Sequence, residues 1–391
     1  MDASAPTLRQ ERQPASDEIV EVAPGVLRLQ LNINFPGLGH VNCYAMEDRH
    51  GITLVDPGLP GLNPWRQLTK RMHQAGLPVK RVHTVVVTHS HPDHFGAAER
   101  IRQETGAEIV THENFKTWWD PDEEDDEHKE LADPADLDAW AAARERLVKF
   151  WRSARRGGPN FRWNQPTPWG GAHPRPPRSV RLRYRAQSLM ASRYIRPPQP
   201  SRRVVDGEIL PIGDTDWVAV HTPGHTVDHL CLLDPVAGTL ISGDHVLPTI
   251  TPHISGLVRA ADPLDLFLGS LDTVSAIPGV QRVLPAHGLT FDDLPGRVKE
   301  IKEHHAQRLD LLRTAAADLG EATVEAYSQR LFKPAAWGPM ADSETYAHLE
   351  HLRHQDQATR RAVGHQLLYT VEPDSAAAMR NSAPAAETAA G

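Results

Sequence analysis

The chain has 391 residues, of which 40% are hydrophobic and 24% are charged, and its formal net charge is −8. This composition is ordinary for a globular protein with one large and one smaller domain, and the negative charge argues against a protein that coats nucleic acid. Two cysteines are too few for a disulfide framework or a cysteine-based zinc site. Cys43 and Cys231 each stand in an apolar run, as buried cysteines do.

Residues 1–17 form a polar N-terminus that we expect to be disordered. They contain no apolar stretch of the kind that a signal peptide carries. No part of the chain approaches the ~20 consecutive apolar residues of a membrane span. We therefore expect a cytoplasmic protein without a membrane partner.

Short strands and helices alternate from Ile19 to about residue 115, which is typical of an α/β layered domain. The stretch 65–77 is amphipathic, with Trp65, Leu68 and Met72 on one side, and Gly106 ends the next helix. We expect helices over residues 65–77 and 97–107, and strands over residues 21–31, 41–46, 51–58, 82–89 and 107–113.

Residues 116–203 interrupt this alternation, and we interpret them as an insertion into a domain that spans residues 18–298. The insertion opens with an acidic run, continues with a helical stretch, and contains thirteen arginines and no acidic residue between Arg152 and Arg203. One interpretation is a solvated face that the acidic run neutralises. The other is a flap that binds an anion, either an acidic substrate or RNA.

The strand pattern returns after the insertion, and the chain becomes helical from Lys299. Three helices followed by a strand favour a small winged-helix-like domain over residues 299–371, and residues 372–391 read as a disordered, low-complexity tail. We expect strands over residues 208–214, 216–225, 229–234, 239–248 and 280–288, helices over 300–320, 323–332 and 343–362, and a last strand over 366–372.

Residues 85–97, VVVTHSHPDHFGA, place four metal-binding side chains directly after a buried strand. His89 and His91, on the turn after the strand, can converge on one ion. Asp93 and His94, at the start of the next helix, can point at a second ion nearby. Imidazole nitrogen and carboxylate oxygen suit zinc, iron or manganese.

Three further candidate ligands also stand just past apolar strands. His225 follows WVAV in a TPGH turn, Asp244 follows TLIS, and His287 follows VQRVL in a PAHG turn. Each of these residues taken alone would suit an ordinary turn. Four strand ends that all carry histidine or aspartate instead predict one shared metal site.

The motifs THSHPDH, TPGHT, SGD and PAHG, in this order, resemble those of the metallo-β-lactamase-fold hydrolases, and the resemblance spans about residues 18 to 300 apart from the insertion. It implies an αββα four-layer sandwich with two metal ions at one edge. By this resemblance Asp244 bridges the two ions, as in the glyoxalase II and ribonuclease Z branches. His91 stands where flavodiiron proteins carry an acidic residue, which favours hydrolysis over redox chemistry. The implied ligands are His89, His91 and His225 for the first ion, and Asp93, His94 and His287 for the second.

The C-terminal part is similar to a narrower branch of this family. The stretches TPGHTVDH, SGDHVLP, TPHIS and PAHG, followed by the helical residues from Arg297, resemble β-lactamase-like proteins of the endoribonuclease type and bacterial hydrolases of unassigned substrate. Members of that branch carry a winged-helix-like domain after the metal domain.

Two divalent ions that share a water lower its pKa, and the hydroxide attacks a carbonyl or phosphoryl centre. Zinc is the favoured metal, with iron or manganese as alternatives. We expect Asp93 to be both a ligand and the residue that orients the attacking water. Asp56 is a candidate to hold a ligand histidine, with an ordinary turn aspartate as the alternative. His229, His245 and His253 are candidates for contact with a ligand or the substrate, with an ordinary polar loop role as the alternative for each.

The predicted enzyme is therefore a metal-dependent hydrolase of a small, anionic ester, thioester or lactone. One alternative is a metal-dependent endoribonuclease or phosphodiesterase, for which Trp151, Trp163 and Trp169, interleaved with arginines, would supply stacking faces. A mononuclear-iron dioxygenase of the same fold is a second alternative. A homodimer is also left open.

Overall fold

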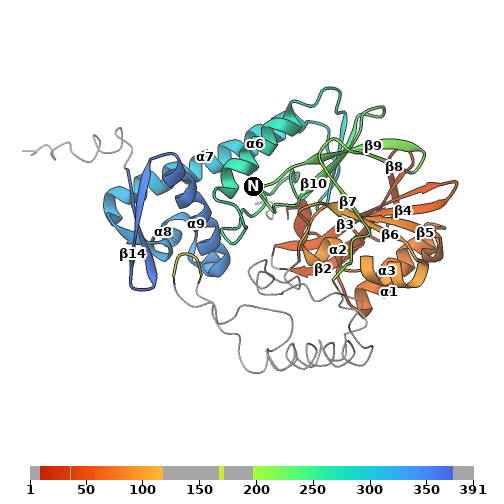
Figure 1. Ribbon diagram of the computed structural model, residues 1–391, viewed down its shortest axis with the longest axis horizontal. Helices are drawn as coiled ribbons and strands as arrows, with labels where there is room; N and C mark the ends of the chain where they lie inside the picture. Colours follow the sequence, from red (N-terminus) through yellow and green to blue (C-terminus); the bar gives the residue numbers. More distant parts are fainter. Residues whose placement is uncertain (1–8, 36, 118–166, 171–196, 373–391) are drawn as a thin grey trace, which may run out of the picture.

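The computed structural model describes residues 9–35, 37–117, 167–170 and 197–372, and Figure 1 draws the others as a thin grey trace. Most of the expected insertion, including Trp151 and Trp163, lies outside the described residues, as do residues 373–391 of the expected tail. None of the described helices is long and apolar enough to cross a bilayer.

A seven-stranded sheet carries the N-terminal part of the chain, with its strands in sequence order. The first four strands pair antiparallel, and the pairs from β4 to β7 are parallel. Helices α1 (Leu62–Gln74) and α3 (Ala98–Thr105) cover its outer face, where Leu68, Met72 and Ile101 pack against the sheet. The strands are β1 (Val20–Ala23), β2 (Val26–Phe35), β3 (Leu38–Asp48), β4 (Gly51–Val55), β5 (Val82–Val86), β6 (Glu108–His112) and β7 (Arg202–Val204).

A five-stranded sheet follows in the order β12-β11-β10-β9-β8, with only the β11–β12 pair parallel. Helix α6 (Pro263–Ser275) packs against its outer face, with Phe267 and Leu271 in one cluster with Cys231, Leu240 and Val283 of the sheet. The strands are β8 (Ile209–Ile212), β9 (Thr215–His221), β10 (Leu230–Asp234), β11 (Thr239–Gly243) and β12 (Arg282–Pro285).

The two sheets face each other across an apolar core. Tyr44 and Val86 of the first sheet share a cluster with Trp217, Leu232 and Ile241 of the second, and all five are at most 1% exposed. Strands β4 and β11 are buried along their whole length, as expected for strands that are covered on both faces. The layers are therefore helix, sheet, sheet, helix, which confirms the expected αββα sandwich (Figure 1).

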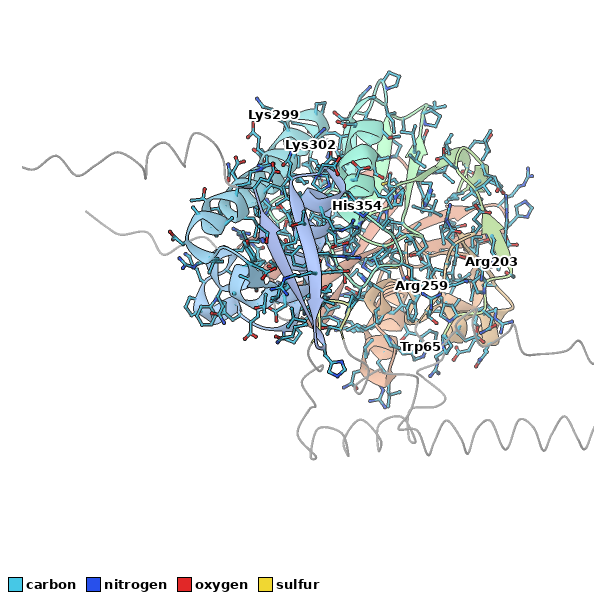
Figure 2. All side chains as sticks on the ribbon, turned by 60° about the vertical axis from the view of Figure 1, so that its left-hand side comes forward. Trp65, Arg203, Arg259, Lys299, Lys302 and His354 are labelled. Carbon is cyan, nitrogen blue, oxygen red and sulfur yellow. The ribbon has the colours of Figure 1, made fainter. Side chains whose placement is uncertain are left out.

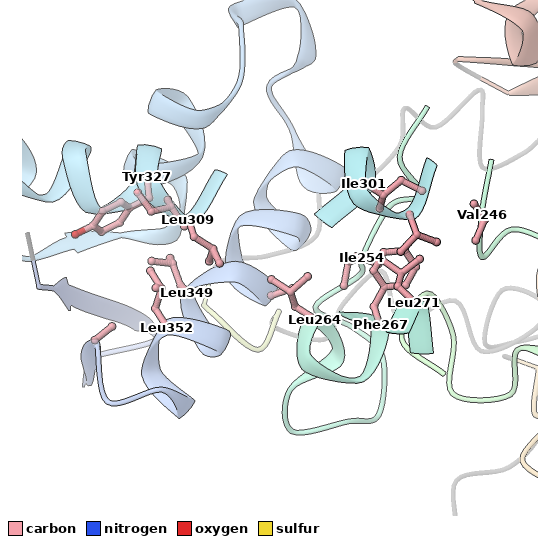
Figure 3. Packing of buried hydrophobic residues seen from close by; sticks show 14 of the residues in the cluster. Val246, Ile254, Leu264, Phe267, Leu271, Ile301, Leu309, Tyr327, Leu349 and Leu352 are labelled. Carbon is pink, nitrogen blue, oxygen red and sulfur yellow. The ribbon is translucent and has the colours of Figure 1, made fainter. Parts of the chain in front are cut away.

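The C-terminal part joins α7 (Leu294–Leu319), α8 (Val324–Leu331) and α9 (Pro339–His354) to a small sheet of order β13-β15-β14. Its apolar core is continuous with the layer formed by α6. Figure 3 shows Leu264, Phe267 and Ile301 in the same cluster as Leu309 and Leu349. The winged-helix-like character of this part stays a prediction. The strands are β13 (Ala322–Thr323), β14 (Ala358–Val363) and β15 (Gln366–Val371).

The expected helix over residues 343–362 is wrong beyond residue 354. Helix α9 ends at His354, and residues 358–363 instead form β14, which pairs antiparallel with β15. Val363 faces Gln366, so only Gly364 and His365 form the turn. Gly364 has a φ of 61°, the left-handed conformation that a two-residue hairpin turn favours. The hairpin therefore overrides the helical pattern of the sequence.

The N-terminus is also not disordered throughout, as residues 1–17 were expected to be. Gln10–Arg12 form a short 3-10 helix, and Glu11 is wholly buried. Its carboxylate accepts hydrogen bonds from the backbone N–H of Thr249 (2.7 Å) and of Ile250 (3.0 Å), and from the Thr249 hydroxyl. A buried carboxylate with three donors holds this part of the N-terminus in place.

Two pieces of the expected insertion belong to packed structure. Arg202 and Arg203 lie in β7, the edge strand that pairs parallel with β6. Trp169 is only 8% exposed, its ring lies tilted against that of Tyr346 of α9 with centroids 5.2 Å apart, and its carbonyl accepts a hydrogen bond from the N–H of Leu367. Trp169 is therefore part of the C-terminal core and not a stacking face for nucleic acid.

Candidate metal centre

The candidate ligands follow four strands that end at one edge of the sandwich. Strands β9, β11 and β12 run in the same direction, because β10 is antiparallel to both β9 and β11 and the β11–β12 pair is parallel. The ends of these three strands deliver His225, Asp244 and His287, and the end of β5 in the facing sheet delivers His89 and His91. The structure thus brings all seven predicted ligands together.

The turn after β5 passes directly into α2 (Pro92–Phe95), a single helical turn. His91 is the residue before the helix, and Pro92 occupies the first helical position, where its missing N–H costs nothing. Asp93 and His94 are buried in this turn. The short turn explains how four side chains so close in sequence point toward two groups of ligand atoms.

The first group consists of His89, His91, His225 and Asp244, whose ligand atoms all lie within 4.8 Å of one another. His91 Nδ1 lies 3.0 Å from His89 Nε2 and 3.1 Å from His225 Nε2. Asp244 Oδ2 lies 3.8 Å from His89 Nε2 and 3.6 Å from His225 Nε2.

The second group consists of Asp93, His94 and His287, within the same limit. Asp93 Oδ2 lies 3.7 Å from His94 Nε2 and 3.6 Å from His287 Nε2. Asp244 also reaches this group, because its Oδ2 is 3.6 Å from His94 Nε2 and its Oδ1 is 3.2 Å from His287 Nε2. One carboxylate therefore faces both groups.

The donor atoms fit divalent metal ions. Nitrogen and oxygen ligands ~2.0–2.1 Å from a shared tetrahedral ion stand ~3.3 Å apart, close to the separations in both groups. His94 Nε2 and His287 Nε2 are buried and have no hydrogen-bond partner. Buried polar atoms without a partner are costly, and a bound cation removes that cost.

Asp56 contacts His94, which is one of the two roles that the sequence left open for it. Its Oδ2 accepts a hydrogen bond from His94 Nδ1 at 2.8 Å. It also accepts from Thr88, whose hydroxyl lies 2.8 Å from Oδ2 and whose N–H lies 2.9 Å from Oδ1. A carboxylate on Nδ1 fixes the ring so that Nε2 points at the ligand group.

Backbone carbonyls orient two more ligand histidines. The carbonyl of His253 accepts from His225 Nδ1 at 2.8 Å, and the carbonyl of His40 accepts from His287 Nδ1 at 2.6 Å. Asn42 holds the turn that carries His287, since its Nδ2 donates to two carbonyls, of Pro285 (2.7 Å) and of Gly288 (2.9 Å). The strand β3 thereby fixes the position of the β12 turn.

His229 holds the turn that carries Asp244 and is not a member of either ligand group. Its Nε2 accepts from the backbone N–H of Asp244 at 3.0 Å, and its Nδ1 lies 2.7 Å from the Thr222 hydroxyl. Gly243 has a φ of 51°, and a Cβ there would lie 2.5 Å from His229 Nε2. Only glycine therefore allows this close approach.

The other two predicted contact residues, His245 and His253, have different surroundings from His229 and from each other. His245 is buried and packs edge-on against Phe267 with ring centroids 5.1 Å apart, and burial lowers its pKa to about 3. It lies behind His229 as a neutral packing residue. His253 reaches His225 through its carbonyl, whereas its side chain turns toward Glu344, where Nδ1 lies 3.1 Å from Oε2.

Electrostatics separate the histidines of the two groups. Burial and neighbouring histidines hold the pKa values of His89 and His91 well below the ordinary range, so both rings are neutral and able to ligate. Burial opposes charge on His94 as well, but Asp93, Asp244 and Asp56 raise its pKa well above that range. Positive charge is thus favoured where the carboxylates converge, whether a proton or a metal ion supplies it.

Comparison with known proteins agrees with this geometry. Residues 36–287 match the model of the metallo-beta-lactamase superfamily, a range that contains all seven candidate ligands and more than half of the chain. The chain belongs to the metallo-β-lactamase superfamily. The family expected from the sequence motifs is confirmed.

Solved relatives cover this metallo-β-lactamase-fold chain nearly completely. A metallo-beta-lactamase family protein from Thermus thermophilus is 26% identical, with a TM-score of 0.65 over 90% of this chain and 100% of its own. A beta-lactamase domain protein from Burkholderia ambifaria is also 26% identical, with a TM-score of 0.65 over 92% of this chain and 96% of its own.

Curated relatives match a shorter part of this chain than the solved structures do. Lactamase-like protein aptB of Emericella nidulans is 31% identical over 121 residues, which are 29% of this chain and 34% of that protein. Lactamase-like protein vrtG of Penicillium aethiopicum is 31% identical over 123 residues, or 32% of this chain and 38% of that protein. The chain thus spans about a third of the length of these relatives. Family and relatives support the expected enzyme class, a metal-dependent hydrolase.

Two buried carboxylates near the centre were missed by sequence reasoning. Asp228 accepts from the Ser90 hydroxyl at 3.0 Å and so braces the loop between His89 and His91, and burial raises its pKa to about 6. Its place in the TPGHTVDH stretch was a signal that could have found it. Glu344 gave no local signal, because it lies on a helix 91 residues after its partner His253.

Proposed function

We propose that this protein is a metal-dependent hydrolase that cleaves a small anionic ester, thioester or lactone with water. The observation that carries the proposal is the position of Asp244, whose two carboxylate oxygens face both groups of ligand atoms, at 3.2–3.8 Å. Such a shared carboxylate suits a pair of ions.

In this proposal one ion would be held by His89, His91 and His225, and the other would be held by Asp93, His94 and His287. Asp244, which faces both groups, would complete both sites. Zinc is favoured because neutral imidazoles and carboxylates at these spacings are its usual donors, although iron and manganese use the same atoms. Bound divalent ions supply a Lewis acid that lowers the pKa of water and stabilises negative charge on the reacting oxygen.

Asp93 is the residue assigned to the water. Its Oδ2 lies between His94 Nε2 (3.7 Å) and His287 Nε2 (3.6 Å), so the carboxylate is held at the centre. There it can accept a proton from the attacking water and orient the remaining lone pairs toward the substrate carbonyl.

A cysteine nucleophile does not fit this structure, because neither cysteine is available. Cys43 and Cys231 are wholly buried, and burial raises the pKa values of both thiols, to about 12 for Cys231. A neutral, buried thiol is a poor nucleophile and cannot reach a substrate.

The distribution of charge supports a small substrate over a nucleic acid. Figure 2 shows Lys299 and Lys302 on α7 at one side of the molecule and Arg203 on β7 at the other. Lys302 contacts Asp272 at 2.5 Å, and Arg203 Nη1 donates to backbone carbonyls, of Glu113 at 2.8 Å and of Phe115 at 3.0 Å. These cations form no shared track for a phosphate backbone. That the substrate is anionic stays a prediction from the arginine-rich residues, most of which lie outside the described part.

The test is metal analysis followed by a panel of thioesters, lactones and phosphodiesters on the metal-loaded protein. Two ions per chain with turnover of esters or lactones is the expected result. Turnover of phosphodiesters alone would instead favour the nuclease alternative, and one iron per chain would favour the dioxygenase. Asp244→Ala should lose metal and activity, whereas Asp216→Ala, which changes an exposed aspartate at the start of β9, should lose neither.

A further inference from the structure

A segment of irregular backbone, residues 251–255, lies between the metal centre and helix α9. On one side the carbonyl of His253 accepts the hydrogen bond of His225 Nδ1 at 2.8 Å. On the other side the ring of His253 contacts Glu344 of α9, with Nδ1 at 3.1 Å from Oε2. One residue thus joins a candidate metal ligand to the C-terminal helices.

The carbonyl of His253 determines which nitrogen of His225 is free. A carbonyl only accepts, so His225 Nδ1 must carry the proton and Nε2 must present its lone pair. That nitrogen lies 3.1 Å from His91 Nδ1 and 3.6 Å from Asp244 Oδ2, inside the first ligand group. The ring orientation of His225 therefore depends on where this carbonyl is held.

Helix α9 holds the segment at two adjacent residues. Besides the contact of Glu344 with His253, the Ser343 hydroxyl accepts from the N–H of Gly256 at 3.0 Å and lies 3.2 Å from the Ser255 hydroxyl. Ile254 between them is wholly buried, and Figure 3 shows it beside Phe267 of α6. The segment has no strand or helix of its own, so these contacts fix its position.

Glu344 is in turn fixed by α7. Arg308 Nη1 lies 3.3 Å from Glu344 Oε1, so one carboxylate oxygen faces Arg308 and the other faces His253. Arg308 is itself held by a hydrogen bond to His304 at 2.8 Å and by the ring of Phe332, 4.4 Å from its guanidinium carbon. Because its two oxygens face Arg308 and His253, the carboxylate of Glu344 has little freedom to move, and the position of His253 is fixed with it.

We propose that Glu344 is a positioning residue for the metal centre: through His253 it fixes the carbonyl that orients His225, so the C-terminal helices complete the first metal site. This inference rests on the proposed function, because it takes His225 as a ligand. Glu344 touches no ligand atom itself and acts through backbone geometry.

The test compares the Zn²⁺ affinities of full-length Glu344→Ala and Glu344→Gln proteins by competition with a chromophoric chelator. Loss of a group that orients a ligand weakens metal binding by about 10–100-fold, and Glu344 acts one contact further away, so we expect about tenfold for Glu344→Ala. Glu344→Gln retains an oxygen that can accept from His253 and should lose less. The absorption bands of Co²⁺ bound in place of Zn²⁺ should shift in the same order.

Glu350→Ala is the matched control, because Glu350 is a buried carboxylate on the same helix that contacts Arg353, Arg360 and Tyr369 and not residues 251–255. It should lower thermal stability but leave the Zn²⁺ affinity unchanged. Equal losses of affinity in Glu344→Ala and Glu350→Ala would overturn the inference, as would an unchanged affinity in Glu344→Ala. His225→Ala tests the proposed metal centre separately from the role of Glu344. If this variant binds Zn²⁺ normally, the proposed metal centre itself is wrong.

Discussion

Asp56 and His94 form a buried pair in which the carboxylate accepts from Nδ1 at 2.8 Å, although Asp56 lies in the left-handed backbone region with a φ of 55°. Non-glycine residues rarely adopt this conformation, and those that do cluster at functional sites. The backbone of Asp56 is held there by its own N–H, which donates to the carbonyl of Val86 at the end of β5. Asp56 thus connects the end of β5, which its backbone contacts, to the candidate ligand His94, which its side chain contacts.

Replacing Asp56 by asparagine should weaken metal binding by about 10–100-fold, because the amide is uncharged and no longer draws the proton of His94 to Nδ1. Asparagine tolerates the left-handed region, so the backbone should persist. The measurement is Zn²⁺ affinity by chelator competition. Asp48→Asn is the control, since Asp48 pairs with His83 (3.3 Å) at the starting end of β5. Equal affinities in the two variants would contradict the orienting role of Asp56.

The clustering of the candidate ligands could be predicted from sequence because five of them lie in turns that follow apolar strands, while Asp93 and His94 lie in the short helix after the first of these turns. Val85, Val86 and Val87 are wholly buried or nearly so, and a rigid buried strand places the next residues at the sheet edge. His225, Asp244 and His287 follow their strands in the same way. The alternation of strands and helices predicted an α/β layered domain. The αββα order of the layers was implied by the resemblance of the metal-binding motifs to the metallo-β-lactamase-fold hydrolases.

Contacts between distant parts of the chain could not be predicted in this way. Glu11 and Thr249 are 238 residues apart, and β7 pairs with β6 across the whole insertion. A polar N-terminus reads as disordered because its composition lacks apolar residues, but one buried carboxylate with three donors is sufficient to anchor it. Tertiary hydrogen bonds of this kind leave no periodic pattern in the sequence.

Glu11 should stabilise the protein through the loop after β11. Glu11→Gln leaves the N–H groups of Thr249 and Ile250 facing a neutral amide oxygen in place of a carboxylate oxygen. Because hydrogen bonds to a charged acceptor are stronger, we expect a loss of about 1 kcal/mol in the free energy of unfolding. Amide hydrogen exchange at Thr249 and Ile250 should accelerate. Glu18→Gln, at an exposed position nearby, should change neither quantity. Unchanged exchange in Glu11→Gln would show that the N-terminal segment does not hold this loop.

Gly243 should be irreplaceable for a reason that goes beyond its backbone conformation. Alanine in the left-handed region costs about 1–2 kcal/mol at any position. At Gly243 the added Cβ would also lie 2.5 Å from His229 Nε2 and so displace the ring that accepts from the Asp244 N–H. Gly243→Ala should therefore lose both stability and Zn²⁺ affinity, as chemical denaturation and chelator competition will measure.

Gly279→Ala is the control for Gly243→Ala, because Gly279 has a φ of 78° and nothing within 4 Å of the added Cβ. It carries the same backbone strain without a collision. We expect it to lose stability only, with Zn²⁺ affinity as in the unchanged protein. A similar affinity in both variants would mean that His229 does not position Asp244.

The charge of Glu344 should make the protein sensitive to acid. Burial alone would raise the pKa of this carboxyl group, but the hydrogen bond from His253 and the charges of Arg308 and His348 outweigh burial and lower the pKa from 4.5 to about 2. A carboxyl group with a depressed pKa stabilises the folded state fully above its unfolded value. Its contribution is lost as the pH falls from about 4.5 toward about 2.

Glu344→Gln removes this titration, so its free energy of unfolding should depend less on pH than that of the unchanged protein. Between about pH 6 and about pH 3 the unchanged protein should lose about 2 kcal/mol more than the variant, from the shift of its pKa at about 1.36 kcal/mol per unit. Urea unfolding of both proteins, each freed of metal by dialysis against a chelator, measures the difference. Parallel pH profiles would mean that Glu344 is not held as a carboxylate between His253 and Arg308.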